Sequence, residues 1–245
     1  MPSNFHIQVL TAMEHHVSLW LCVLMNKKIT ALKAQKKNPN RINIYLDGEY
    51  AFGLSRIVAA WLNVGQELDE EHITTLQRQD AGEVALDKAV KYISYRSRTE
   101  SEIRRKLSEK GFSDLDIEKA LERLRSNGLV ADERFAHSWV ESRSASHPRS
   151  RRLMAMELRQ KGVSNSDIEK ALEETEDDDE LAYQAATQYA HRLTKFEWDK
   201  FRERLSGYLL RRGFTYGTIA PLVRRVWSEF QSVTDQEQNL NKERG

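Results

Sequence analysis

The residues in this sequence best suited to chemistry are clusters of arginine and lysine, whose cations bind phosphate and carboxylate groups. Residues 96–110 hold six basic and three acidic residues, residues 141–161 six and two, and residues 195–225 eight and three. These local excesses predict a basic surface for nucleic acid or an acidic protein. Its predicted binding residues are Arg96, Arg98, Arg104, Arg105, Arg143, Arg149, Arg151, Arg152, Lys161, Arg202, Arg211 and Arg212. The alternative is a solvated helix face with pairs such as Glu102 with Lys106.

The sequence lacks the patterns that carry the common catalytic chemistries. It contains no G-x-x-x-x-G-K-[ST] loop, no G-x-G-x-x-G and no H-E-x-x-H. Its seven histidines do not fall at ligand spacing, and Cys22 is the single cysteine, which excludes an internal disulfide. We therefore expect a protein that is not an enzyme and has no cofactor and no metal.

Composition points to a mainly helical protein. The 245 residues include 31% charged residues at a net charge of +1, with 11 glycines and 4 prolines. Such a balance excludes a uniformly basic or acidic protein. A charged partner must therefore bind to a local patch of one sign on the surface. The apolar run Val17–Met25 is too short to span a bilayer, which takes about 20 residues. We expect a cytoplasmic protein in which residues 1–28 form either a flexible extension or, if translation begins at Met25, a mis-assigned start.

Residues 29–54 are the predicted β region. Apolar and polar residues alternate over 29–35, 42–46 and 50–54, and Asp47-Gly48 between the last two segments is typical of a tight hairpin. Helices are expected over 55–62 and from Asp69 onward. Residues 29–80 are therefore predicted to form a small antiparallel β-hairpin and helix unit.

A repeat of 51 residues organises the rest of the chain. Gly111, Gly162 and Gly213 lie in the matching segments LSEKGFSDLDI, LRQKGVSNSDI and LLRRGFTYGTI. Each glycine is predicted to end a helix in the left-handed conformation, as a structural turn. Ser113 and Ser164 are then predicted to cap the next helix with Asp116 and Asp167, whereas Thr215 with Thr218 should make a weaker cap.

A further helix is expected before each pair, over 82–95, 132–143 and 178–193. The fold class is therefore mainly α, with three tandem three-helix repeats in an elongated curved body after the small β unit. The predicted bounds are 81–143 for the first repeat leading into the second, 144–176 for the second and 177–230 for the third. Residues 231–245 are expected to be a disordered polar tail.

The chain resembles the RecX family of RecA regulators. The resemblance rests on RSRTESEIRRKLSEKGF (96–112), DERFAHSWVESR (132–143), PRSRRLMAMELRQKGV (148–163) and LLRRGF (209–214). The segment INIYLDGEYAFGLS (42–55) resembles the N-terminal extension of longer members. His147-Pro148 departs from the Gly-Pro common in the family.

The resemblance implies a non-enzymatic regulator of DNA repair and the SOS response. Its partners would be the RecA protein and the RecA–single-stranded DNA filament, whose growth, strand exchange and coprotease activity it would limit. A direct contact with single-stranded DNA is a further expectation, no membrane is expected, and the protein should be a monomer. Two alternatives from the residues are a helix-turn-helix transcription regulator and a helical scaffold without a nucleic-acid role. The acidic run 173–180 is expected to lie at a helix start; the alternative is that it repels DNA or contacts a basic recombinase surface.

Overall fold

The computed structural model describes residues 26–243, with side chains as far as residue 232. The expectations for Met1, Met25 and Cys22 lie outside the described residues. The chain divides into two compact units, and the boundary passes through two helices. Unit 1 contains the described residues up to Tyr95 together with Lys106–Leu124, and unit 2 contains Arg96–Arg105 and the chain from Arg125 onward.

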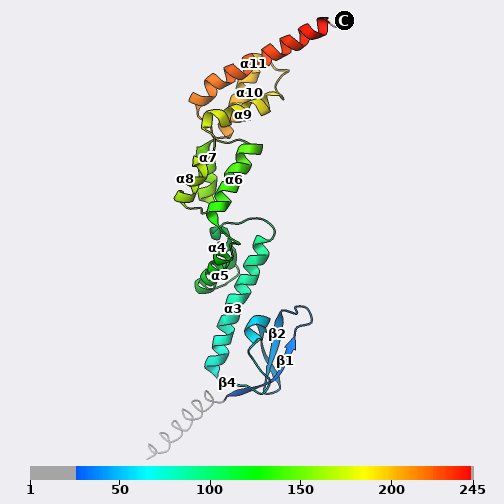
Figure 1. The fold of residues 1–245 in the computed structure, drawn as a ribbon, viewed down its shortest axis with the longest axis vertical. Helices are drawn as coiled ribbons and strands as arrows, with labels where there is room; N and C mark the ends of the chain where they lie inside the picture. The colour runs from blue at the N-terminus through cyan, green and yellow to red at the C-terminus, as the bar shows by residue number, and fades with distance from the viewer. Residues whose placement is uncertain (1–25, 244–245) are drawn as a thin grey trace, which may run out of the picture. The chain divides into compact units, whose positions relative to one another are not determined.

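Unit 1 begins with a small antiparallel sheet (Figure 1). The strands are β1 (Lys27–Ala34), β2 (Arg41–Leu46), β3 (Glu49–Ser55) and β4 (Glu67–Leu68), in the order β3-β2-β1-β4. Asp47 and Gly48 both have positive φ, 51° and 91°, which confirms the predicted tight turn between β2 and β3. Strand β4 was not predicted, because two residues are too few to show an alternating pattern.

One face of this sheet is buried. Ile29, Ile44 and Leu54 have no exposed surface, and the short helix α2 (Arg56–Ala59) and the long helix α3 (Glu70–Ile93) both contact β3. Helix α3 is also the first helix of the first repeat, which continues with α4 (Glu100–Ser108) and α5 (Asp114–Ser126).

Unit 2 contains the second and third repeats. Helices α6 (Asp132–Ser146), α7 (Arg151–Gln160) and α8 (Asn165–Glu173) form the second. Helices α9 (Asp178–Ala190), α10 (Trp198–Arg211) and α11 (Tyr216–Glu243) form the third. One apolar cluster runs through both repeats, with Met154, Phe201 and Val226 among its buried members. The structure therefore confirms a mainly helical fold of three three-helix repeats after a small antiparallel sheet.

The three turn glycines adopt the predicted conformation. Their φ angles are +81° at Gly111, +81° at Gly162 and +89° at Gly213. In each turn the residue after the glycine donates its N–H to a carbonyl five residues back, as from Val163 to Leu158 at 3.1 Å. This bond is the signature of a Schellman ending, so the glycines end the middle helices α4, α7 and α10 as expected.

The caps of the third helices also follow the sequence. Ser113 Oγ accepts the N–H of Asp116 and donates to its carboxylate at 2.6 Å, and Ser164 does the same with Asp167 at 2.8 Å. Thr215 has only 3.4 Å contacts with Thr218, which confirms the weaker third cap.

One helix ends later than expected, and another differs in length from its equivalents in the other repeats. Helix α11 continues to Glu243, where a polar tail was expected; its last residues are mainly Gln, Glu, Asn and Lys, several of which favour helix. Helix α10 begins one turn earlier, relative to its turn glycine, than α4 and α7 do. Thr99 and Ser150 lie immediately before α4 and α7, each twelve residues before the turn glycine of its repeat. The equivalent position of the third repeat is Phe201, which is buried and lies inside α10.

Candidate functional site

The Lys161-Gly162 turn of the second repeat packs against the start of helix α4. Thr99 Oγ1 donates a hydrogen bond to the carbonyl of Lys161 at 2.6 Å, and Lys161 Nζ contacts Glu102 Oε1 at 3.0 Å. Gly162 lies so close to Ser101 that a Cβ there would overlap that side chain. The predicted binding residue Lys161 therefore forms part of the contact between the first and second repeats.

The same joint recurs one repeat later. The N–H of Ser150 donates to the carbonyl of Arg212 at 3.0 Å, and Arg212 Nη1 donates to the carbonyl of His147 at 3.0 Å. A Cβ on Gly213 would lie 2.5 Å from Ser150 Oγ. Thr99 and Ser150 are both fully buried, so each joint encloses a helix cap. We call these two contacts the repeat joints.

An aspartate from the following repeat completes each joint. Asp132, at the start of α6, accepts the N–H of Glu100 at 2.9 Å, and Asp178, at the start of α9, accepts the N–H of Arg151 at 2.7 Å. These bonds satisfy helix N-terminal donors that have no partner inside their own helix. Burial raises the pKa of Asp132, and the nearby Glu100, Asp167 and Glu102 add to that effect, although the Glu100 N–H opposes it.

Glu102 is the buried charge of the first joint. Burial by itself would raise the pKa of its carboxyl group. The hydrogen bond and charge of Lys161, with further help from Arg96 and the Thr99 N–H, outweigh burial and hold that pKa below its ordinary value. Arg96, another predicted binding residue, lies 3.6 Å from the same carboxylate. The expected pair of Glu102 with Lys106 is replaced by these contacts, and Lys106 pairs with Glu109.

Two more of the predicted arginines, Arg143 and Arg149, form ion pairs with Glu157. Its carboxylate accepts from Arg143 Nε at 3.1 Å and from Trp139 Nε1 at 3.0 Å, and it also pairs with Arg149. The Arg143 guanidinium lies 4.3 Å from the centre of the Trp139 ring and Lys161 Nζ lies 4.6 Å from it. We call this group the Glu157 cluster. It holds Arg143 and Arg149 within the fold, in cation–π and ion-pair contacts.

The predicted arginines therefore divide into two groups. The first group is held within the fold. It contains the arginines of the joints and of the Glu157 cluster, together with Arg151, which donates to the carbonyl of Leu172, and the half-buried Arg98. Arg105, Arg152 and Arg211 are exposed and pair with no acidic side chain in the part of the chain that the structure describes. Arg104 is exposed as well, and Arg202 lies 3.7 Å from the exposed Asp199.

The three exposed, unpaired arginines share a face in the repeat. Arg152, Arg105 and Arg211 lie ten, six and two residues before the turn glycine of their own repeats. Positions four residues apart fall on one face of a helix. In repeat register, these arginines therefore mark one exposed face of the middle helix, which we call the outer arginine face.

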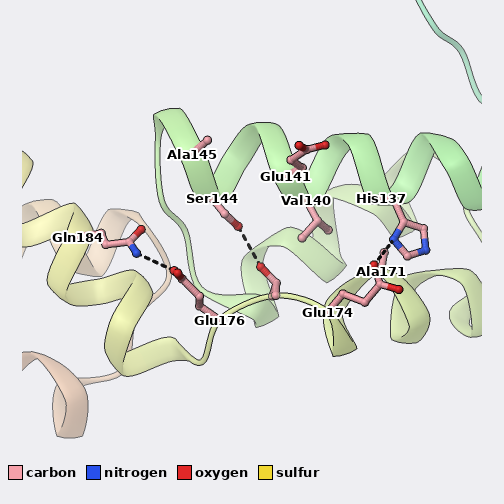
Figure 2. A pocket seen from close by; sticks show the side chains of 10 residues that line it. His137, Val140, Glu141, Ser144, Ala145, Ala171, Glu174, Glu176 and Gln184 are labelled. Carbon is pink, nitrogen blue, oxygen red and sulfur yellow. Dashed lines mark hydrogen bonds and ion pairs between the residues drawn. The ribbon is translucent and has the colours of Figure 1, made fainter.

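A groove of about 430 Å³ lies between α6, α8 and the loop before α9 (Figure 2). His137 Nδ1 lies 3.3 Å from Glu174 and Ser144 Oγ lies 3.1 Å from Thr175 Oγ1, while Gln184 donates to Glu176 at 2.6 Å. The acidic run 173–180 thus supplies local contacts here, and Asp177 caps α9 through the N–H of Glu180. These contacts support the expectation that the run serves a helix start.

No group of histidine, cysteine, aspartate and glutamate residues in residues 26–243 is arranged to bind a metal ion. No helix within the described part is both long and apolar enough to cross a membrane.

Comparison with known proteins gives matches along most of the chain. The model of the regulatory protein RecX N-terminal domain matches residues 27–69. The models of the first, second and third RecX three-helix domains match residues 85–124, 132–172 and 176–223. The four matches follow the sheet and the three repeats in order.

Whole proteins agree with these matches. Regulatory protein RecX of Clostridium perfringens strain 13 is 31% identical over 205 residues, which cover 81% of this chain and 96% of the relative. That of Bacillus pumilus is 30% identical over 215 residues, covering 85% and 81%. A crystal structure of regulatory protein RecX superposes with a TM-score of 0.64 at 32% identity, covering 80% of this chain and 98% of the other. RecX from Lactobacillus salivarius, at 22% identity and a TM-score of 0.51 over 60% of this chain and 97% of the other, shares the fold.

Proposed function

Because the chain belongs to the RecX family of regulatory proteins, we propose that it binds the RecA recombinase and the RecA–single-stranded DNA filament. In this proposal it inhibits filament growth, strand exchange and coprotease activity, and so acts in DNA repair and SOS control. It does so as a binding protein and not as an enzyme, in the cytoplasm where the filament forms.

The observation that supports the proposal most directly is the outer arginine face. A guanidinium without an intramolecular acid is available to a phosphate or carboxylate of a partner, and its fork geometry suits either group. Arg105, Arg152 and Arg211 meet this condition, one in each middle helix. Arg143, Arg149 and Lys161 do not, because each already forms an ion pair with Glu157 or Glu102. The proposed interface is therefore narrower than the twelve residues expected from sequence.

The repeat joints support a filament partner over a DNA operator. In a helix-turn-helix regulator the second helix of each motif enters the major groove. Here the turns at Gly162 and Gly213 are covered by the start of the preceding middle helix, so they act in stacking. Repeats that stack on one another present equivalent positions to a partner that is itself repetitive.

The test is a RecA strand-exchange and ATPase assay on single-stranded DNA with increasing amounts of the chain. A triple variant, Arg105→Glu with Arg152→Glu and Arg211→Glu, should need at least about tenfold more protein for the same inhibition. The matched control carries Arg192→Glu, Lys195→Glu and Arg224→Glu. These cations are also exposed and belong to unit 2, but lie outside the middle helices.

Three outcomes would count against the proposal. Absence of any effect of the wild-type chain on RecA at every ratio would contradict RecA regulation itself. An equal loss of inhibition in the two triple variants would show that inhibition depends on the net charge of the protein and not on the outer arginine face. Tight binding to one duplex sequence without RecA would favour the transcription-regulator alternative.

A further inference from the structure

The N-terminal unit exposes a tryptophan that the helical repeats do not explain. Trp61, just after α2, has 86% of its surface exposed, and Ile57, one helical turn earlier, has 59%. Trp139, Trp198 and Trp227 are all partly buried against the core of unit 2. A large aromatic side chain left in solvent is a common mark of a binding surface.

Trp61 lines one of two grooves that meet at α2. The groove with Trp61 measures about 440 Å³ and also contains Arg78, Lys119 and Arg123. The second measures about 640 Å³ and contains Arg41, Arg56, Lys88 and Lys91. Ile57 and Glu83 line both grooves, so the two are adjacent along the surface of unit 1. We call this continuous surface the α2 track.

The charges of the α2 track leave an excess of free cations. Arg41 pairs with Asp80 at 2.9 Å, Lys91 pairs with Asp87 at 2.9 Å, and Arg123 pairs with Glu83. Four further cations are exposed and pair with no acidic side chain among the described residues: Arg56, Arg78, Lys88 and Lys119. The remaining acid in the two linings is Glu122. The track is therefore positive and has one exposed aromatic ring, that of Trp61, among the residues that line it.

We propose that the α2 track binds single-stranded nucleic acid, with a base stacked on Trp61 and the neighbouring phosphates on Arg56, Arg78, Lys88 and Lys119. A cationic groove with an aromatic platform is the arrangement that binds single strands without reading their sequence. A duplex fits it poorly, because its bases are already stacked on one another and cannot reach an aromatic ring.

An apolar protein segment is a less suitable occupant for the same residues. The cores of protein interfaces are depleted of charged side chains, lysine above all. In the α2 track Lys88 and Lys119 lie in the grooves themselves, and the exposed apolar surface there is limited to Ile57 and Trp61 among large side chains. This inference goes beyond the proposed regulation of RecA, because it concerns another unit of the chain and needs no recombinase.

The experiment is fluorescence anisotropy of the full chain with labelled oligodeoxythymidylate, oligouridylate and a hairpin duplex, all without RecA. Trp61→Ala should weaken single-strand binding by about fivefold to a hundredfold, the range expected for the loss of one stacked base. Trp61→Phe should retain most of the affinity, because a phenyl ring still stacks. Tyr216→Ala is the matched control, since Tyr216 is an aromatic residue with 74% exposure in another unit.

Salt dependence tests the phosphate contacts separately. The double variant Arg78→Glu with Lys119→Glu should weaken binding and reduce the slope of log affinity against log salt by about 1.4, as expected for two lost contacts. Binding of either single strand more tightly than the hairpin duplex supports the α2 track. The single strand that binds more tightly of the two identifies the polymer as DNA or RNA.

Two results would overturn the inference. One is wild-type affinity of Trp61→Ala for both single strands, and the other is a duplex bound as tightly as either single strand. A Trp61→Ala variant that binds oligonucleotides normally but has lost RecA binding would assign the surface to a protein. Because the oligonucleotide assay contains no recombinase, its failure leaves the proposed regulation of RecA standing, and the converse also holds.

Discussion

Glu102 and Lys161 form a nearly buried ion pair across 59 residues of sequence, and it joins the first repeat to the second. The Glu102 side chain is 9% exposed and that of Lys161 is 17% exposed. Removal of one partner leaves the other charge without its counter-charge, which costs far more than the pair itself contributes. The pair is therefore a sensitive point at which to measure the coupling between repeats.

Glu102→Gln should lower the free energy of unfolding by about 2 kcal/mol at neutral pH. The folded-state pKa of Glu102 lies below its ordinary value of 4.5, so its contribution is complete above that value and is lost as the pH falls through the lower one. The difference between wild type and variant should thus be constant from about pH 6 to 8 and shrink in acid. Urea unfolding across this range measures it, with Glu109→Gln as the exposed control. A difference that persists at acid pH would rule out the charge as the cause.

Gly162→Ala and Gly111→Ala form a matched pair of variants. Both glycines have a φ of +81°, so an added Cβ carries the same backbone strain of about 1 kcal/mol at each site. Around Gly111 no atom lies within 4 Å of that Cβ, whereas at Gly162 it would overlap Ser101. Gly162→Ala should therefore lose an additional 1–3 kcal/mol or so in urea unfolding.

The double variant Ser101→Gly with Gly162→Ala should recover part of the additional loss, because the overlapping side chain is then absent. Equal losses at Gly111 and Gly162 would show that the second turn does not pack as tightly as the structure indicates.

Asp132→Asn should leave the chain at least as stable as wild type at pH 7. The pKa of Asp132 is raised by burial, so its ionised form is disfavoured in the folded state, and that cost grows as the pH rises through the window above its ordinary value. Asparagine has no charge and still offers an oxygen to the N–H of Glu100. Asp132→Ala removes the acceptor and should lower the unfolding free energy by about 1 kcal/mol. Thermal unfolding of the two variants at pH 4 and pH 7 separates charge from hydrogen bond, and a less stable asparagine variant at pH 7 would contradict the argument.

Arg149→Glu and Arg152→Glu should behave differently although they lie three residues apart. Arg149 pairs with Glu157, so reversal of its charge places two carboxylates together and should lower the melting temperature by several degrees. Arg152 is exposed and unpaired among the described residues, so its reversal should leave the melting temperature within about 1–2 °C of wild type. Differential scanning calorimetry provides the comparison. A similar drop in both would mean that Arg152 also has a structural partner.

The repeats and their turns could be predicted because their signals are local. The glycine, the cap residue and the acid three positions later lie within six residues of one another, and each has a direct conformational meaning. The three glycine conformations, the two strong caps and the weak third cap all followed from them.

The joints could not be predicted in the same way, because their contacts span roughly 60 residues. Lys161 and Arg212 have the same sequence signature as an exposed basic residue at a helix end, and only the fold shows that they contact Glu102 and His147. The role of Glu157 could not be predicted, because one of two acids among six basic residues only lowers the net charge of the segment and does not indicate the centre of a cluster. Trp61 and its grooves depend on how α2, α3 and α5 pack, which no short pattern contains.

The longer α10 has a consequence for growth of the architecture. Thr99 and Ser150, at the starts of α4 and α7, contact the turn of the following repeat, but at the same position the third repeat has the buried Phe201, whose ring lies 4.9 Å from that of Trp227 in α11. A glycine turn like those at Gly162 and Gly213 would therefore meet an apolar side chain at that position of the third repeat, and not the hydroxyl-capped helix start that the first two repeats present.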